Sequence, residues 1–407
     1  MKLGFFSTEY IRKHPGMAES DRELCHELAR RGTDVCALVE DRGVPPGEVI
    51  VDRDGPVRLW RYQGPRFRPL SLRAYADKGL KAAFGSPRLA SLLALYRRFL
   101  AAHGDLDLLQ VEAPFPEGAL VGLAARRAGT PFIVSARGWE RVKFPWLRER
   151  AIRWTLRRAA GVRPNALNMA RILVERFGVD SRRVRTIRTN LSREAYLPPG
   201  TDLGAFRADG RARVRARYAL GHRCLLAAAA RFVPSKGLEH LLDAVRLLRD
   251  REVPVGLILC GDGMLRADLQ QRATALGLRE DVVFAGAVPH AEMRDVLAAA
   301  DLLVVPAVLD WTPRAAVEAA VVGTPAVVTS GVGCAPWMLE AGAGRVVSPG
   351  DARALADAVQ GWLNDDTSRA DAGRRALAWA GTFAVERVAE ELEQFHRAVV
   401  RGPAQQG

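Results

Sequence analysis

Residues 224–237 read Cys-Leu-Leu-Ala-Ala-Ala-Ala-Arg-Phe-Val-Pro-Ser-Lys-Gly. The apolar run 224–229 predicts a buried strand, and Gly237 opens a segment with helical periodicity. Arg231 and Lys236 lie in the turn between them, and every cation that follows Lys236 is an arginine. A lysine kept at such a junction indicates a site that needs a compact ammonium group beside a planar guanidinium, as phosphate sites often do. A surface lysine left by chance is the alternative.

Short apolar runs alternate with longer amphipathic stretches through the rest of the second half. This alternation predicts a doubly wound α/β domain, in which helices cover both faces of a parallel sheet. The predicted strands are 224–229, 255–260, 282–284, 302–305, 326–329 and 345–347, and the predicted helices are 237–250, 264–276, 290–299, 313–322, 351–364 and 368–380. Ligands of such sheets bind beyond the carboxyl ends of the strands.

The first half shows the same pattern less regularly. Strands are predicted at 3–7, 35–39, 57–62, 108–111, 132–135 and 184–187, helices at 19–31, 72–102 and 116–127, and Gly16 in the turn before the first helix. A boundary is expected at Leu197-Pro-Pro-Gly200, with a linker to about residue 210. We therefore expect one domain over residues 1–200, a second over 201–383, and a last helix with a tail over 384–407.

Bulk properties predict a cytoplasmic two-domain protein. A chain of 407 residues is long for one core. It contains no apolar run of 18 residues, and its first residues do not resemble a signal peptide. The five cysteines are scattered and form no Cys-x-x-Cys motif, which favours reduced thiols and argues against a zinc site.

The net charge of +14 is concentrated in the first half. Residues 1–200 hold 36 Lys and Arg against 21 Asp and Glu, whereas the second half is close to neutral. Such a basic half favours an anionic partner, which could be a membrane surface, a phosphorylated acceptor or a nucleic acid. The alternative is a solvated arginine-rich surface that reflects codon usage.

Polar or glycine-containing turns follow the other predicted strands of the second half. Gly261-Asp-Gly263 follows the second strand, and the segment 286–288 follows the third. Asp310 follows the fourth strand, and Glu318 stands eight residues later. A doubly wound sheet would gather all of these turns at one edge.

These residue types fit a phosphorylated, hydroxyl-rich ligand. Arg231 and Lys236 could neutralise a diphosphate and the charge that develops on it as it leaves. Pro313 suits the first turn of a helix, whose free amides bind anions. Glu318 could accept hydrogen bonds from a ribose diol, and Asp310 could hold the hydroxyls of a second sugar.

With these features the chain resembles the retaining GT-B glycosyltransferases of glycosyltransferase family 4, strongly over residues 223–365 and more loosely over the first half. The motifs that carry the resemblance are Arg231-x4-Lys236-Gly, Gly261-x-Gly263, the segment 282–286, Asp310-x7-Glu318 and Gly323-Thr-Pro-Ala. The resemblance implies an α/β fold of the GT-B class, with two doubly wound Rossmann-like domains facing across a cleft and a C-terminal helix that crosses back to the first domain.

The same resemblance implies roles for individual residues. Arg231 and Lys236 would bind the nucleotide diphosphate, Glu318 the ribose and Asp310 the donor sugar, and these four are the expected catalytic residues. The further expected donor-binding residues are Gly16, Gly261, Gly263, Gly286, Val288, Trp311, Thr312 and Pro313.

The chain departs from the family pattern at several of these positions. Asp310 replaces the usual glutamate, which shortens the reach of the carboxylate by about 1.5 Å and predicts an altered contact with the donor sugar. Gly16 stands in a phosphate loop that lacks its second glycine. Arg137 stands where many members carry a histidine, and Arg137, Trp139 and Glu140 are expected on the acceptor side.

The resemblance implies a configuration-retaining hexosyl or other glycosyltransferase that uses a nucleotide-diphosphate sugar as co-substrate, with no cofactor and no metal. The acceptor stays open between a lipid-linked or polysaccharide intermediate, a small-molecule aglycone and a phosphosugar. The basic half predicts a peripheral contact with an anionic membrane at its inner face. A sugar phosphorylase or synthase of the same fold is the alternative function, and a non-catalytic nucleic-acid-binding protein is a weaker one, because no known nucleic-acid-binding motif is present.

Overall fold

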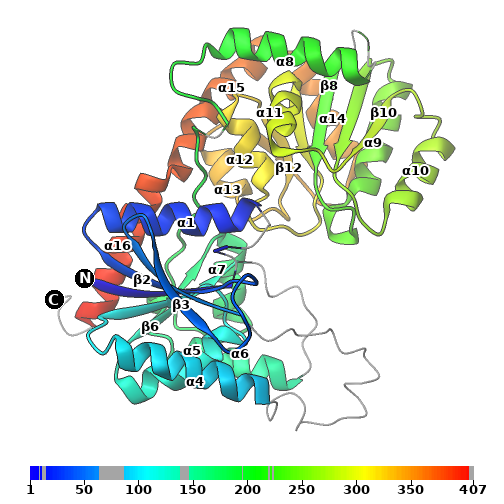
Figure 1. Ribbon diagram of the computed structural model, residues 1–407. Coiled ribbons are helices and arrows are strands. Elements are labelled where there is room, and N and C mark those ends of the chain that lie inside the picture. The colour runs from blue at the N-terminus through cyan, green and yellow to red at the C-terminus, as the bar shows by residue number, and fades with distance from the viewer. Residues whose placement is uncertain are drawn as a thin grey trace. The chain divides into compact units, whose positions relative to one another are not determined.

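The computed structural model describes residues 1–8, 10–11, 15–63, 87–137, 146–194, 196–218, 221 and 224–402. The chain forms two α/β units, each built on its own sheet, which is parallel throughout in unit 2 and parallel except for one edge hairpin in unit 1 (Figure 1). Unit 1 comprises Met1–Asn190 together with Val385–Gly407, and unit 2 comprises Leu191–Ala384. The chain therefore passes from unit 1 to unit 2 before the expected boundary at Leu197-Pro-Pro-Gly200. Leu191, Tyr196 and Leu197 already belong to the core of unit 2.

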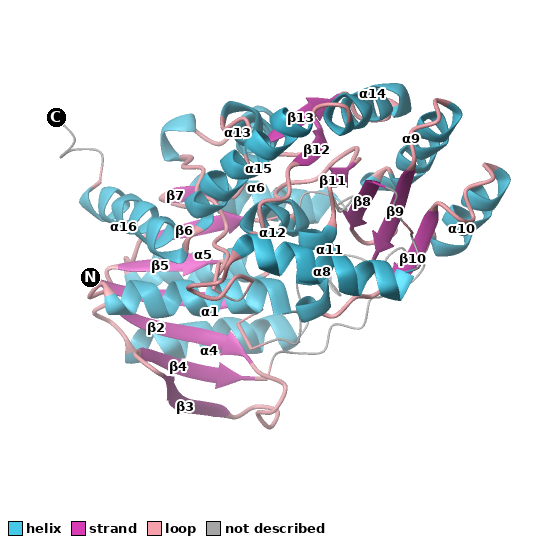
Figure 2. Ribbon diagram, turned by 90° about the horizontal axis from the view of Figure 1, so that it is seen from above, coloured by secondary structure: helices cyan, strands magenta, loops and turns pink. Residues whose placement is uncertain are grey.

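Unit 1 is built on a seven-stranded sheet in the order β3-β4-β2-β1-β5-β6-β7 (Figure 2). The strands are β1 Lys2–Ser7, β2 Asp34–Glu40, β3 Val49–Asp54, β4 Val57–Tyr62, β5 Leu108–Val111, β6 Phe132–Ala136 and β7 Gly161–Pro164. The helices are α1 Pro15–Arg30, α4 Pro87–Ala102, α5 Glu117–Ala128, α6 Trp146–Arg158, α7 Leu167–Glu175 and α16 Val385–Arg401. Only β3 and β4 pair in antiparallel fashion, as a hairpin at one edge. The strand order reverses between β1 and β5, where ligands of such sheets bind.

Two expectations for unit 1 are wrong, and two of its strands were not expected. Residues 184–187 form no strand, since Val184 makes only an isolated bridge to Val162, and the edge strand is β7 instead. β7 is not recognisable in the sequence because it contains Arg163 and Pro164, and neither residue is typical of a buried strand. The hairpin strand β3 is unexpected as well, and Gly16 lies inside α1 rather than in the turn before it.

The last helix, α16, returns to unit 1 and packs against α1, which confirms the expected crossing. Its apolar face joins the core beneath α1 through Val388, Leu392 and Phe395. Gly161 of β7 is required there, since a Cβ at that position would lie 2.5 Å from the Phe395 ring. Glu393 of α16 is buried and accepts a hydrogen bond from Arg31 Nε at 3.2 Å.

Unit 2 is built on a six-stranded, wholly parallel sheet in the order β10-β9-β8-β11-β12-β13 (Figure 2). The strands are β8 Cys224–Ala229, β9 Val255–Cys260, β10 Val282–Gly286, β11 Leu302–Val305, β12 Ala326–Thr329 and β13 Gly344–Val347. The helices are α8 Leu203–Tyr218, α9 Leu238–Asp250, α10 Arg266–Ala275, α11 His290–Ala299, α12 Arg314–Val321, α13 Ala335–Glu340, α14 Ala352–Leu363 and α15 Asp366–Ala380. The sheet reverses its order between β8 and β11.

Helices cover both faces of this sheet because successive strand residues point to opposite sides. In β8, Leu225 and Ala227 face the core shared with α11, α12 and α15, whereas Leu226 and Ala228 face the core shared with α9, α10 and α14. The expected doubly wound sheet of unit 2 is therefore confirmed strand by strand. Two of its helices were not expected: α8 occupies most of the segment read as a linker, and the short α13 follows the glycine-rich turn after β12.

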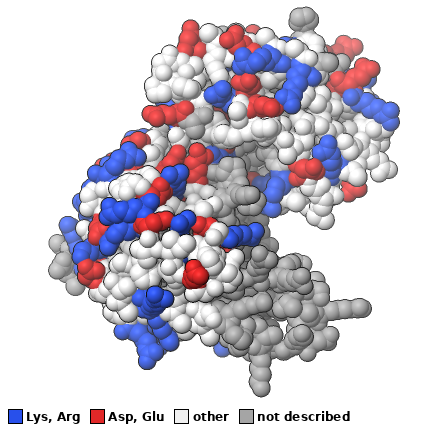
Figure 3. Space-filling view, viewed as in Figure 1, with Lys and Arg blue, Asp and Glu red and all other residues white. Residues whose placement is uncertain are grey.

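Several arginines of unit 1 pair with nearby carboxylates. Figure 3 shows Lys and Arg interleaved with Asp and Glu over the face viewed. Arg22 binds Asp54 at 2.7 Å, and Arg58 binds Asp34 at 2.9 Å. Part of the positive charge of unit 1 is therefore offset by local ion pairs. Among the helices that the structure describes, none is long and apolar enough to cross a membrane.

Candidate functional site

Two loops meet at the point where the sheet of unit 2 reverses its order. Lys236 ends a 3₁₀ turn (Pro234–Lys236) after β8, and it forms an ion pair with Asp310 in the loop after β11. The two side chains are 12% and 11% exposed. The fold thus brings together two residues that the sequence places after different strands, as expected for a site at a topological switch point.

The backbone around Asp310 is held from both sides. Gly237 has a φ of 59° and lies so close to the loop after β11 that a Cβ would be 2.3 Å from the Pro306 carbonyl oxygen. On the other side, Asp310 N donates to Gly331 O at 3.0 Å, and Gly333 N donates to Asp310 O at 2.9 Å. The position of the Asp310 carboxylate is therefore set by three loops of the sheet edge.

Gly261 and Gly263 have a packing role. Gly261 has a φ of 129°, and a Cβ there would lie 1.9 Å from Ala230 O. A Cβ on Gly263 would lie 2.5 Å from Phe232 O. The Gly-x-Gly turn consequently packs directly against the backbone on both sides of Arg231. That side chain is exposed, and within the described residues its guanidinium has no ion-pair partner.

Glu318 lies in the second turn of α12 and is only 5% exposed. Its Oε1 accepts hydrogen bonds from Tyr196 Oη and from Arg314 Nε, the latter at 2.7 Å. Tyr196 Oη also lies 3.1 Å from His290 Nδ1. Burial, followed by the negative charge of Glu318, raises the pKa of Tyr196, so the phenol keeps its proton and donates it. Pro313 is the N-cap of α12 and precedes the first helical turn, in which it was expected.

The other expected donor-side residues lie on the same edge of the sheet. Gly286 ends β10 with a φ of 74°, and Val288 packs against the core of unit 2 just before α11. Trp311 is buried, and its backbone N donates to Asp310 Oδ1 at 2.9 Å. Thr312 is half-buried in the loop that leads into α12.

Chemically, this edge combines two cations, two carboxylates and the backbone amides that open α12. Lys236 and Arg231 can bind an anionic group, and the amides of α12 add to that capacity. Asp310 and Glu318 are acceptors suited to hydroxyl groups. In the part of the chain that the structure describes, three or more His, Cys, Asp or Glu side chains nowhere cluster in a way that could hold a metal ion.

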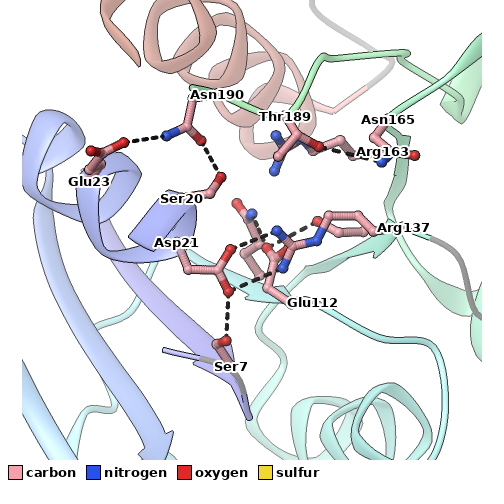
Figure 4. Close-up of polar contacts among 12 residues, drawn as sticks. Ser7, Ser20, Asp21, Glu23, Glu112, Arg137, Arg163, Asn165, Thr189 and Asn190 are labelled. Atoms are coloured by element: carbon pink, nitrogen blue, oxygen red, sulfur yellow. Dashed lines mark hydrogen bonds and ion pairs between the residues drawn. The ribbon is translucent and has the colours of Figure 1, made fainter. Parts of the chain in front are cut away.

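A buried charged network lies at the corresponding edge of unit 1 (Figure 4). Arg137, directly after β6, binds Asp21 of α1 at 2.7 Å and Glu112, after β5, at 2.7 Å. Ser7, at the end of β1, donates to Asp21 Oδ2 at 2.7 Å. The side chains of Arg137, Asp21 and Glu112 are 7%, 1% and 6% exposed. The charge of Arg137 is thus offset within unit 1, and its contact with an acceptor stays a prediction.

A second set of contacts ties α1 to the end of the first long segment of unit 1. Ser20 Oγ donates to Asn190 Oδ1 at 2.7 Å, and Asn190 Nδ2 donates to Glu23 Oε2 at 3.2 Å (Figure 4). Thr189 accepts a hydrogen bond from Asn165 Nδ2 at 3.4 Å. The residues just before the crossing into unit 2 are therefore fixed at the carboxyl edge of the unit 1 sheet.

The remaining predicted residues of unit 1 are placed only in part. Gly16 lies in the first turn of α1, the helix that carries Ser20 and Asp21. Trp139 and Glu140 lie outside the described residues.

The hydrogen-bond and ion-pair partners of the predicted site residues are harder to predict from the sequence than the site residues themselves. Arg314 precedes Glu318 by four residues, the spacing at which opposite charges pair on a helix, so that signal is available. Tyr196 directly precedes the stretch interpreted as a domain boundary, and nothing in the sequence around it indicates a contact with α12. Likewise, nothing in the sequence around Asp21 or Glu112 indicates that each pairs with Arg137.

Two family models cover most of the chain. The model described as "Glycosyl transferases group 1" matches residues 215–379, which contain every sheet strand of unit 2. The model described as "Glycosyl transferase 4-like domain" matches residues 16–190 of unit 1.

Individual proteins are similar over much of their length. A GDP-mannose-dependent alpha-(1-6)-phosphatidylinositol monomannoside mannosyltransferase of Mycolicibacterium smegmatis is 32% identical over 315 residues, covering 72% of this chain and 76% of that protein. A 2-deoxystreptamine glucosyltransferase of Streptomyces kanamyceticus is 28% identical over 354 residues, covering 82% of this chain and 87% of its own length. The crystal structure of Anabaena HepE in complex with UDP superimposes with a TM-score of 0.71 at 20% identity, covering 97% and 99% of the two chains.

Proposed function

The chain belongs to the group 1 glycosyl transferases of glycosyltransferase family 4, and on this premise we propose that it moves a sugar from a nucleotide-diphosphate sugar to an acceptor hydroxyl with retention of configuration. Membership of this family supports transfer over the phosphorylase and nucleic-acid-binding alternatives. The observation that carries the assignment of the donor site is the meeting of Lys236 and Asp310 at the switch point of unit 2, with Glu318 on the helix that follows.

Each part of the donor has a counterpart at this edge. Lys236, Arg231 and the amides of α12 would bind the diphosphate and offset its charge, so we propose that no divalent cation is needed. Glu318 would accept a hydrogen bond from the ribose, and the turn that contains Gly286 and Val288 would flank the base. Asp310 would face the donor sugar, close to the diphosphate, because it pairs with Lys236.

The proposed reaction exchanges one bond for another at the anomeric carbon. The bond between that carbon and the diphosphate oxygen breaks, and a bond to the acceptor oxygen forms on the same face. The acceptor proton passes to the leaving phosphate oxygen, so no enzyme base is consumed. Lys236 and Arg231 would stabilise the negative charge that develops on the diphosphate. Arg137 cannot replace a base, since a guanidinium stays protonated.

For the acceptor we propose a hydroxylated compound that is either lipid-linked or free. The two similar proteins have one acceptor of each kind in their names, a phosphatidylinositol mannoside and 2-deoxystreptamine. The arginine-rich surface of α5 and α6 supports the lipid-linked choice, because Arg150, Arg157 and Arg158 are exposed there beside the partly exposed Leu123. A vesicle-flotation assay with and without anionic lipid at two salt concentrations tests membrane contact.

A panel of nucleotide sugars tests the donor assignment. We expect one of GDP-mannose, UDP-glucose or a related donor to raise the melting temperature, since a ligand that binds only the folded state stabilises it. Incubation of that donor with inositol-containing and 2-deoxystreptamine acceptors should yield a product whose anomeric proton coupling reports retention. Turnover should persist in EDTA. An inverted product would refute the retaining mechanism, and the absence of any stabilising nucleotide sugar would refute the donor site.

A further inference from the structure

The two oxygens of the Glu318 carboxylate differ in their hydrogen bonding. Oε1 accepts hydrogen bonds from Tyr196 and Arg314. Oε2 accepts no hydrogen bond from any residue that the structure describes, and it is not completely buried, although the Glu318 side chain as a whole is only 7% exposed. A carboxylate that is anchored through one oxygen presents the other in a fixed direction.

The direction of every hydrogen bond around Tyr196 follows from proton counting. A phenol has one proton, and Tyr196 donates it to Glu318. Arg314 Nη2, at 3.4 Å from Tyr196 Oη, is necessarily a donor. His290 Nδ1, at 3.1 Å, must then carry a proton and donate as well. Tyr196 itself is fully buried, which shields its hydroxyl from water.

The network joins two parts of the proposed donor site that are distant in the chain. His290 begins α11, directly after the turn expected to flank the base, and its ring packs edge-on against Tyr196 at a centroid distance of 4.4 Å. Arg314 begins α12, directly after the loop that carries Asp310. Tyr196 comes from the segment that enters unit 2 and lies between the two helices.

We propose that Tyr196 and Arg314 are positioning residues, which hold Oε1 of Glu318 and thereby direct Oε2 at the ribose hydroxyls of a nucleoside diphosphate. This inference rests on the proposed function, in which Glu318 is the ribose acceptor. Loss of the Tyr196 hydroxyl frees the carboxylate to turn away from the ribose, while the contacts of Lys236 and Arg231 with the diphosphate are unchanged. The effect should therefore depend on whether the ligand carries ribose hydroxyls.

Titration calorimetry with ribose and dideoxyribose probes measures this dependence. UDP and GDP are titrated into wild type to find which binds tighter, and the 2′,3′-dideoxy form of that nucleotide is then compared with it. In Tyr196→Phe we expect affinity for the ribose form to fall about tenfold, as for loss of one hydrogen bond to a charged group. Affinity for the dideoxy form should change less than about twofold. Tyr218→Phe, which removes a hydroxyl from a half-buried tyrosine of α8, should change neither.

Arg314 provides an independent test should Tyr196→Phe fold poorly. Arg314→Met should lower the preference for ribose in the same way, and Arg314→Lys should restore part of it, because an ammonium can still donate to Oε1. Equal losses for the ribose and dideoxy probes, or no loss in either variant, would overturn the positioning role. If wild type binds neither UDP nor GDP, and no nucleotide sugar of the panel stabilises it, the donor site itself is refuted. If wild type binds them without preferring ribose, only the inference about Glu318 is refuted.

Discussion

Lys236 and Asp310 stand 74 residues apart in the chain and form an ion pair where the sheet of unit 2 reverses its strand order. An ammonium group has three donors, so Lys236 can hold Asp310 and a phosphate oxygen together. The pair thus links the part of the site that would bind the diphosphate to the part that would bind the donor sugar.

Replacing Lys236 by alanine should lower turnover by about 100-fold or more, because the charge developing on the diphosphate loses its nearest ammonium. Initial rates with the identified donor measure this. Arg246→Ala is the matched control, since Arg246 is an exposed cation of α9 that pairs with Asp250 at the helix surface. Turnover of Lys236→Ala equal to that of the control would contradict the assignment.

Asp310→Asn should lower kcat more than it lowers affinity for the bare nucleotide. The amide keeps the size of the side chain but loses the charge that pairs with Lys236 and would accept from sugar hydroxyls. We expect kcat to fall about 100-fold and the dissociation constant of the nucleoside diphosphate to change within about threefold. Parallel loss of both quantities would argue against a role at the donor sugar.

Gly261→Ala should destabilise unit 2 by about 3 kcal/mol, because the new Cβ would collide with Ala230 O in a backbone region unfavourable to alanine. Denaturant unfolding measures the change. Gly381→Ala is the matched control: Gly381 has a helical φ of −60°, and a Cβ there meets nothing within 4 Å. Similar stabilities of the two variants would contradict the packing role of the glycine turn.

Arg137→Met should destabilise unit 1 by about 3–5 kcal/mol, because it leaves the buried carboxylates of Asp21 and Glu112 without their cation. Thermal unfolding of the full chain measures the loss. Adding Asp21→Asn to Arg137→Met should recover part of the stability, since one uncompensated charge is removed. A double variant less stable than Arg137→Met would contradict this account of the network.

His396 of α16 should make unit 1 sensitive to mild acid. It is fully buried with Nε2 2.8 Å from Gln110 Oε1, and burial, followed by the charge of Arg163, lowers its pKa to about 3. Between pH 3 and 6.5 the unfolded chain binds a proton that the folded chain does not, so stability falls as the pH falls below 6.5. The loss at pH 5 should be about 2 kcal/mol.

His396→Gln tests this prediction because glutamine can still donate to Gln110 but does not titrate. Its stability should fall less between pH 7 and pH 5 than that of wild type, and the two should run parallel above pH 7. Identical slopes over the acid range would show that His396 is not the group responsible.

The regular βα alternation of unit 2 made its strands predictable, because each strand is an uninterrupted apolar run with its helix directly after it. In unit 1, the segment 184–187 has the composition of a strand but makes only one bridge, whereas β7 contains Arg163 and Pro164 and still forms the sheet edge. Gly161 of β7 packs against Phe395 of α16, which is remote in sequence, and no local pattern indicates that contact.

Those residues of the candidate site that come directly after a strand could be predicted from the sequence. Lys236 and Asp310 were found because a parallel sheet brings the carboxyl ends of its strands together. Tyr196 and Asp21 were not found, since their partners are fixed only by the packing of helices that are remote in sequence. Arg137 was expected to face a ligand, but its environment depends on Asp21 and Glu112, which no spacing rule connects to it.

The return of α16 to unit 1 has a consequence for biosynthesis. Unit 1 needs residues 385–401 to cover the apolar face of α1, and these leave the ribosome only after the whole of unit 2. The unit encoded first is therefore completed last, so a nascent chain would carry an unfinished N-terminal core while unit 2 is already able to fold.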